Sequence, residues 1–156
     1  RTAGLARTTR ELLQLASLLG RTFPVQPLRQ LRRRAGEQLV SAEEDGLVQL
    51  EHGPVPGTFE HGPTTGHFVH GLVADALSAM VPAGSRVSWH DELCRALVAC
   101  RFSAVAVAPQ AVGAADLDPI RAAQACRDAA VEQSVVFEWS RSPGLVAEWV
   151  SAERPG

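Results

Sequence analysis

The feature that most constrains the fold is a change of hydrophobic period near residue 70. Residues 67–70 place two apolar side chains between two histidines and are predicted to form a short strand. From residue 72 the apolar positions recur at helical spacing. The predicted buried stripe of this helix comprises Leu72, Val73, Ala76, Leu77 and Met80. A strand is thus predicted to pass directly into a helix, with His70 at the junction. The segments before and after this junction determine which fold contains it.

Three short helices, a strand and a loop are predicted before this junction. Their ranges are a helix at 8–19, an extended link at 23–25, helices at 26–34 and 37–45, a strand at 47–51 and a loop rich in glycine and proline at 52–66. Thr8 or Thr9 can cap the first helix, which is apolar on nearly all sides and therefore central. Leu39 and Val40 are predicted to face inward. Helix, helix, helix, strand, loop, strand is the order of a winged helix, with the third helix in the DNA-reading position.

The second half of the chain predicts further helices. They are a helix from a Ser85 cap to about Cys100, a helix at 103–115 in which a strand is the alternative, a helix from Asp118-Pro119 to about Gln133, and a short helix at 145–150. The helix after Pro119 is expected to carry its apolar residues at Ile120, Ala123, Ala130 and Val131.

We therefore predict a mostly α protein with two parts. Residues 1–81 form a winged-helix domain of three helices and a two-stranded wing. Residues 82–156 form antiparallel helical hairpins, either a helical linker or the start of an α-solenoid. Because the first residue is arginine and not methionine, we expect the chain to be a fragment or an excised domain.

The 156-residue chain contains no lysine, so all 15 of its basic residues are arginine. This excludes a P-loop lysine, a Schiff-base lysine and a lysine general base from the segment. Ser88, His90 and Asp91 are close in sequence, but neighbours on one helix point in different directions and do not make a catalytic triad. We expect no catalytic residues and no independent enzyme.

Other composition features predict the compartment. Three scattered cysteines do not make a disulfide framework, and no apolar run reaches the length of a membrane span. With no signal-peptide pattern at the start, the prediction is a soluble cytoplasmic protein that does not contact a membrane.

Two groups of side chains could bind ligands. The basic cluster Arg29, Arg32, Arg33 and Arg34 predicts phosphate contacts on a nucleic acid or a nucleotide, and the alternative is a solvated helix face. Acidic residues at 43–45 on the third helix would repel DNA. Four histidines lie at 52, 61, 67 and 70, but their spacings match no common zinc pattern, so no metal site is predicted.

Several motifs occur here in a recognisable order. Residues 68–77 read Phe-Val-His-Gly-Leu-Val-Ala-Asp-Ala-Leu, and Val-Pro-Ala-Gly follows at 81–84. This resembles the Phe-Arg-His-x-Leu-Val-Arg-x-Ala-Leu segment of ATP-dependent LuxR-type regulators from actinobacteria, which are signal-transduction ATPases with numerous domains (STAND). Residues 10–23 resemble the start of the same winged-helix domain, and residues 45–48 the end of its third helix. Residues 101–133 are less similar to the helical linker of the family.

The resemblance implies a non-catalytic regulatory module of a multidomain transcriptional regulator. Such a module relays nucleotide or effector state between an AAA-type ATPase core and a tetratricopeptide-like sensor region, which are its implied partners. DNA would be contacted through another domain. ATP or ADP would be bound in the parent protein, and no cofactor by this segment alone.

The resemblance also assigns a role to one residue. In related STAND proteins a winged-helix histidine contacts the phosphate of bound ADP, and His70 occupies that position. Two residues depart from the family pattern, because Ala74 stands where arginine is usual and Ser78 where tyrosine is common. The alternative is that His70 only fixes the strand-to-helix corner. Two other functions remain alternatives for the whole segment: an autonomous winged-helix DNA-binding domain, and a protein-docking helical module that uses Trp139 and Trp149.

Overall fold

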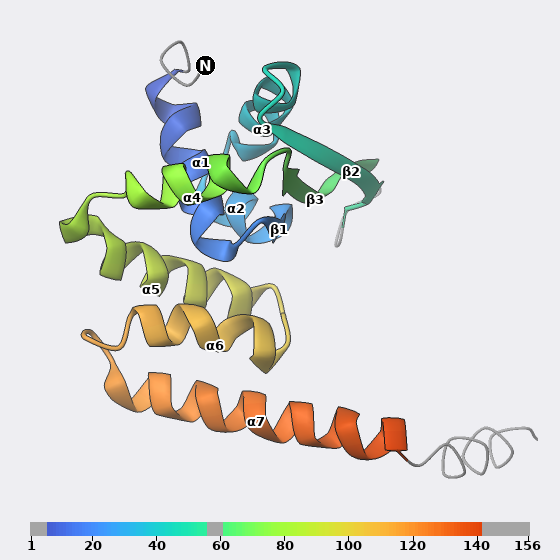
Figure 1. Cartoon of the computed structure of the whole chain (residues 1–156), viewed down its shortest axis with the longest axis vertical. Helices are drawn as coiled ribbons and strands as arrows, with labels where there is room; N and C mark the ends of the chain where they lie inside the picture. The colour runs from blue at the N-terminus through green and yellow to red at the C-terminus, as the bar shows by residue number, and fades with distance from the viewer. Residues whose placement is uncertain (1–5, 56–60, 142–156) are drawn as a thin grey trace, which may run out of the picture.

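The computed structural model describes residues 6–55 and 61–141, and it is mostly helical with one small antiparallel sheet (Figure 1). In these residues the elements are α1 (Arg7–Leu19), β1 (Thr22–Pro24), α2 (Val25–Leu31), α3 (Ala35–Glu44), β2 (Val48–Pro54), β3 (His61–Phe68), α4 (Gly71–Ala79), α5 (Ala83–Ala99), α6 (Ala104–Gly113) and α7 (Pro119–Arg141). No described helix has both the length and the apolar content that a membrane span requires.

The three strands form a sheet in the order β1-β3-β2, so the last strand in the chain is the central one. Both pairings are antiparallel, and Thr22 of β1 lies opposite His67 of β3. The β2–β3 pairing has an irregular register between Glu51 and His52. β1 lies where the sequence predicts only an extended link, so the sheet has one strand more than the predicted two-stranded wing.

The predicted limits of the last strand (67–70) and of the loop before it (52–66) are wrong. β2 continues to Pro54 and β3 already begins at residue 61, so much of the segment rich in glycine and proline is paired. Pro63 is tolerated in the central strand because it lies opposite His52, beside the irregularity, where the hydrogen-bond ladder is already disrupted.

The main core surrounds α1, as its apolar sequence predicts. Leu12, Leu13 and Leu15 are fully buried, and α2, α3, β1 and α5 also contribute buried side chains to the cluster. Phe23 of β1 is fully buried against Phe68 of β3, with ring centroids 5.2 Å apart. This cluster joins the sheet to the first four helices and places the strand-to-helix corner after β3 at the surface.

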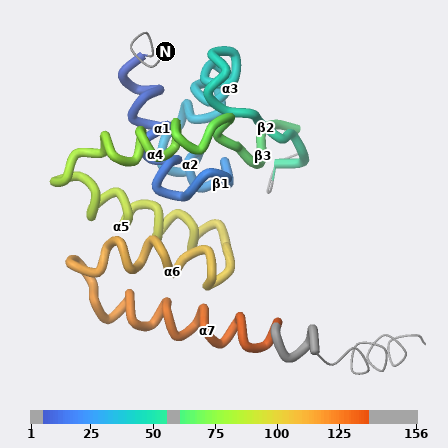
Figure 2. The backbone as a smooth tube through the Cα atoms, viewed as in Figure 1, coloured from blue at the N-terminus to red at the C-terminus, as the bar shows by residue number. Residues whose placement is uncertain are grey.

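A second apolar cluster lies between α5, α6 and α7, which stack in successive layers beside the sheet-containing half (Figure 2). α5 belongs to both clusters, because Leu93 lies in the first and Cys94 in the second. Polar bonds reinforce this junction. Gln110 of α6 donates to the carbonyl oxygen of Leu18 at 2.8 Å, and its side-chain oxygen lies 2.8 Å from Nδ1 of His90.

Helix faces are where the sequence predictions fail most clearly. In α4 the side chains of Leu72 (81% exposed) and Met80 (50% exposed) face solvent, whereas Ala74 and Leu77 are buried. The predicted stripe is therefore wrong for Leu72, Ala76 and Met80. The helix begins directly after β3, so the orientation of the strand exit determines which side of α4 meets α1.

α7 shows the same error. Ile120, Ala123, Ala130 and Val131, the predicted apolar residues, are exposed, and the helix packs inward through Ala122 and Ala125. Small residues let two helices approach closely, so the face of α7 that bears them is the buried one, although larger apolar side chains lie on other faces. α7 also continues to Arg141, beyond the predicted end at Gln133.

Three smaller predictions have mixed outcomes. Val40 is exposed, not inward, and the cap of α1 is Ala6 instead of Thr8 or Thr9. Residues 103–115 are helical, and Asp118 caps α7 through its bond to the amide of Arg121 at 2.9 Å. The helix predicted at 145–150, with Trp149, lies outside the described residues, and so does the side chain of Trp139.

Candidate functional site

His70 occupies the corner between β3 and α4. Its backbone is extended (φ −129°, ψ 132°), and it is the cap residue before the first turn of α4. The corner is fixed by backbone bonds, because Val69 donates to Leu47 and Val73 donates to the carbonyl of His70. The imidazole is exposed and bonds to no other described side chain. His70 therefore presents a free imidazole beside the N-terminus of a helix, where a negative charge is stabilised.

Arg21 also lies at this corner, and no local sequence pattern predicted it there. Its guanidinium covers Gly71, because a Cβ at Gly71 would lie 2.6 Å from Cζ of Arg21. The same side chain makes an exposed ion pair with Asp75 at 3.3 Å. Arg21 precedes β1, and Phe68 donates to its carbonyl. Its approach to α4 therefore depends on the β1–β3 pairing, which the sequence analysis did not predict.

The two departures from the family pattern lie on the inner side of α4. Ala74 belongs to the main core and is 3% exposed, so this position cannot present a side chain to the solvent at the corner. Ser78 is half-buried, and its carbonyl accepts a hydrogen bond from Arg86. Arg21 is thus the cation that stands beside His70 in this chain.

Three of the four clustered arginines line one groove. Arg29, Arg33 and Arg34 surround an open cavity of about 690 Å³ together with residues of α3 and with Pro63 of β3. Arg32 points away from it and lies 3.4 Å from Glu92 of α5. Arg34 makes an exposed ion pair with Glu37 at 2.9 Å.

The acidic residues of α3 do not act as one group. Glu43 accepts a hydrogen bond from the amide of Leu50 at 2.8 Å and so ties α3 to β2. Glu44 lines the groove, and Asp45 follows the helix as an exposed residue. The predicted conflict between these acids and a DNA backbone therefore applies mainly to Glu44 and Asp45.

The histidines are dispersed. His67 lies in the central strand, with Nδ1 2.9 Å from the hydroxyl oxygen of Thr22 and Nε2 3.1 Å from Glu51, an ion pair when the imidazole is protonated. His52 and His61 are exposed on the β2–β3 ribbon. Within residues 6–55 and 61–141, no group of three or more His, Cys, Asp and Glu side chains is arranged to hold a metal ion.

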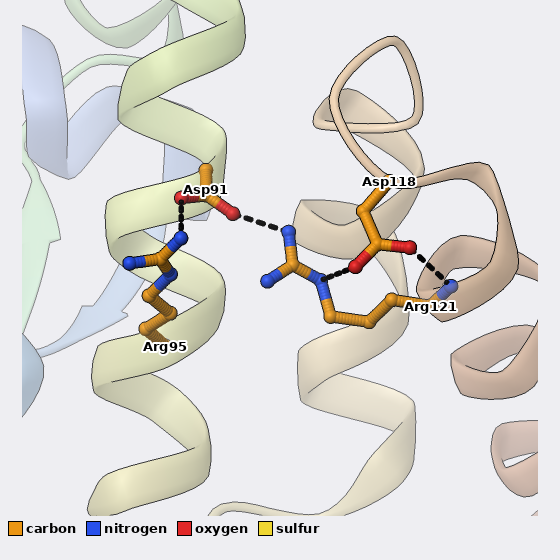
Figure 3. A network of polar contacts seen from close by, with 4 residues as sticks. All are labelled: Asp91, Arg95, Asp118 and Arg121. Atoms are coloured by element: carbon orange, nitrogen blue, oxygen red, sulfur yellow. Dashed lines mark hydrogen bonds and ion pairs between the residues drawn. The ribbon is translucent and has the colours of Figure 1, made fainter.

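Ser88, His90 and Asp91 each have a different partner, as expected for neighbours on a helix. Ser88 donates to the carbonyl of Ser85, and His90 bonds to Gln110. Asp91 belongs to an ion-pair network between α5 and α7, in which it contacts Arg95 at 2.9 Å and also Arg121 (Figure 3).

Because the ion pair between Asp91 and Arg121 is largely buried, its loss is expected to lower the stability of the protein. The side chain of Asp91 is 13% exposed and that of Arg121 is 29% exposed. The hydrogen bond to Asp91 raises the pKa of Arg121. Asp118 lies 3.8 Å from Nε of Arg121 and completes the group (Figure 3). The network joins α7 to α5.

Thiol reactivity is expected to differ sharply between the cysteines. Burial raises the pKa of Cys94 and of Cys100 above the ordinary value of 9.0, whereas Cys126 is exposed. We expect iodoacetamide at pH 8 to alkylate Cys126 first and Cys94 last, as peptide mass mapping over time would show. Equal rates at both positions would contradict the packing of α5 against α6 and α7.

The same shift has a consequence for stability. Because the folded-state pKa of Cys94 is raised, the unfolded chain loses this proton first as the pH rises above 9.0. The contribution of Cys94 to stability is therefore complete below that pH and is lost as the pH rises through the folded-state pKa.

No protein-family model, curated protein or solved structure matches this chain.

Proposed function

We propose that this chain is a non-catalytic regulatory module of a multidomain ATP-dependent transcriptional regulator. It relays nucleotide or effector state between an ATPase core and a sensor region of the longer protein. The observation that carries the proposal is the strand-to-helix corner after β3, which exposes His70 beside the N-terminus of α4. An imidazole N–H can donate to a phosphate oxygen, and a ligand held between two domains clamps them together.

The order and pairing of the elements support a winged helix for the first half. Three helices, with β1 between the first and second, precede the β2–β3 ribbon, and β1 pairs with β3. The paired strands β2 and β3 correspond to the wing, and α3 to the helix that reads DNA in DNA-binding members. α4 then closes the domain against α1 through Ala74 and Leu77.

The helical half supports a link to a sensor region. α5, α6 and α7 stack successively, as helices do in an α-solenoid. The outer face of α7 exposes Ile120, Val131 and Val135 at spacings that place them on one stripe. In a solenoid the next repeat covers this face. The protein that docks on the helical half would therefore be the sensor region of the same longer chain.

Autonomous DNA binding is the weaker alternative. The arginine groove runs along α3, where Glu37 and Glu44 also line it. A duplex lying on this helix would place phosphates against both carboxylates, which opposes binding.

The test uses the full-length regulator. Replacing His70 with alanine is expected to weaken ADP binding about tenfold or more, because a hydrogen bond to a charged group contributes about 1.5–3 kcal/mol. Labelled ADP in an equilibrium binding assay measures the effect. His61→Ala is the matched control, since His61 is an exposed histidine at the opposite end of β3. Equal affinity for ADP in the His70→Ala and wild-type proteins would contradict the proposal.

A further inference from the structure

The groove beside α3 contains an arginine, Arg29, that has no hydrogen-bond or ion-pair partner among the described residues. Arg29 belongs to α2 and is half-buried. Its Nη2 atom lies close to two glycines, because a Cβ would be 3.4 Å from it at Gly36 of α3 and 3.0 Å from it at Gly62 of β3. A side chain at Gly62 would crowd the guanidinium, whereas one at Gly36 would make an ordinary contact, so the guanidinium fits between α3 and β3 mainly because residue 62 has no side chain.

The lack of a partner sets Arg29 apart from the arginines near it. Arg32 pairs with Glu92, Arg34 with Glu37, and Arg21 with Asp75. Within the part of the chain that the structure describes, neither a carboxylate nor a carbonyl accepts a hydrogen bond from Arg29. The N–H groups of this half-buried guanidinium are therefore available to acceptors from outside the chain.

The surroundings of Arg29 concentrate positive charge at one end of the groove. Arg33, which also has no described ion-pair partner, lines the same cavity. Glu37 is already paired with Arg34, and Glu44 lies about 10 Å further along α3, at 1.5 Å of rise per residue. Arg29 also borders a second recess of about 290 Å³, lined in part by Val55 and Phe102. A ligand at Arg29 therefore has room on both sides.

We propose that this groove binds a phosphomonoester group, with Arg29 as the bidentate donor and Arg33 as the second cation. A planar guanidinium pairs with two oxygens of one phosphate, and its fixed position between Gly36 and Gly62 lowers the cost of ordering it. The first turn of α3 begins at the same place and adds the positive end of its dipole. A single phosphate can reach Arg29 without meeting Glu44, whereas a duplex backbone along α3 cannot. The ligand is thus a free phosphate or the terminal phosphate of a small molecule, and the site is independent of His70.

The experiment titrates the 156-residue chain with inorganic phosphate and with adenosine monophosphate by isothermal calorimetry. Arg29→Gln is expected to weaken binding about tenfold or more, and Arg29→Lys to weaken it less. Arg7→Gln is the control for charge, because Arg7 is 91% exposed, pairs only with Glu11 and lies on α1. It is expected to bind as the wild type does. Tighter binding of adenosine monophosphate than of phosphate would identify the second recess as the site of the organic group, and equal binding would identify free phosphate as sufficient.

Gly62→Ala provides a test that does not remove the charge. Its methyl group would lie 3.0 Å from Nη2 of Arg29, closer than an ordinary contact, so the guanidinium must move and phosphate binding is expected to weaken while the circular dichroism spectrum stays that of the wild type. Three results would overturn the proposal: no saturable binding at millimolar phosphate, unchanged binding in folded Arg29→Gln, or an equal loss in Arg7→Gln. If Arg29→Gln does not fold, wild-type affinity in Gly62→Ala overturns it. Duplex DNA that binds more tightly than adenosine monophosphate also overturns it.

Discussion

Replacing Asp91 with alanine is expected to lower the free energy of unfolding by about 3–5 kcal/mol. Asp91 forms ion pairs with both Arg95 and Arg121, and it is largely buried between α5 and α7 (Figure 3). Its removal leaves the guanidinium of Arg121 with only Asp118, at 3.8 Å. α7 buries small alanines against its neighbours, so little apolar area compensates for the uncovered charge.

Urea unfolding followed by circular dichroism measures this effect. Asp75→Ala is the control, because it removes the same group from the exposed Arg21–Asp75 pair and should cost at most about 1 kcal/mol. Replacing Asp91 by leucine and Arg121 by methionine together should cost less than Asp91→Ala, since the two charges that then lose a partner, Arg95 and Asp118, are exposed to solvent. A loss in Asp91→Ala no greater than that in Asp75→Ala would show that the network does not hold α7.

The second large effect is expected at Gly66 in the central strand. A Cβ at this position would lie 2.4 Å from two ring carbons of Phe23. Phe23 is fully buried and packs against Phe68, so its ring has little space to move. Gly66→Ala should therefore destabilise the protein by about 1–3 kcal/mol through overpacking, as measured by urea unfolding.

Gly53→Ala is the matched control on the neighbouring strand. Its Cβ would meet Thr64 at 3.5 Å, an ordinary contact, so the change should be near zero. In a Phe23→Leu background the cost of Gly66→Ala should fall, because the smaller side chain vacates the space. If the losses of unfolding free energy from the two substitutions simply add, then the ring of Phe23 is not what excludes a larger side chain at residue 66.

The elements with a strong local signal could be predicted from the sequence. The apolar residues that surround α1 on nearly all sides at 12–19 identified it as the central helix, and Asp118-Pro119 marked the start of α7. α4 and α7 contain too much alanine for hydrophobic contrast to show which face is buried. The face is decided by tertiary contacts: α4 turns Ala74 toward α1, and α7 approaches its neighbours through Ala122 and Ala125.

The candidate sites were predicted only as lists of residues. His70 and the arginines at 29–34 stand out in sequence, but which arginine lacks a partner depends on distant residues. Glu92 neutralises Arg32, and Gly62 makes room for Arg29. These neighbours are separated from the cluster by whole strands or helices, so no local pattern identifies them. Arg21 was missed for the same reason, because it approaches Gly71 only when β1 pairs with β3.

The sharing of α5 between two cores has a mechanical consequence. Leu93 and Cys94 are adjacent in sequence yet belong to different clusters, so α5 cannot rotate without moving both. α7 has 23 residues and is about 35 Å long at 1.5 Å per residue. If the helical half tilted as one body by about 10° about the start of α7, the far end of this helix would move by about 6 Å. The helical half would thus act as a lever that turns a small motion at the sheet into a large one at its tip.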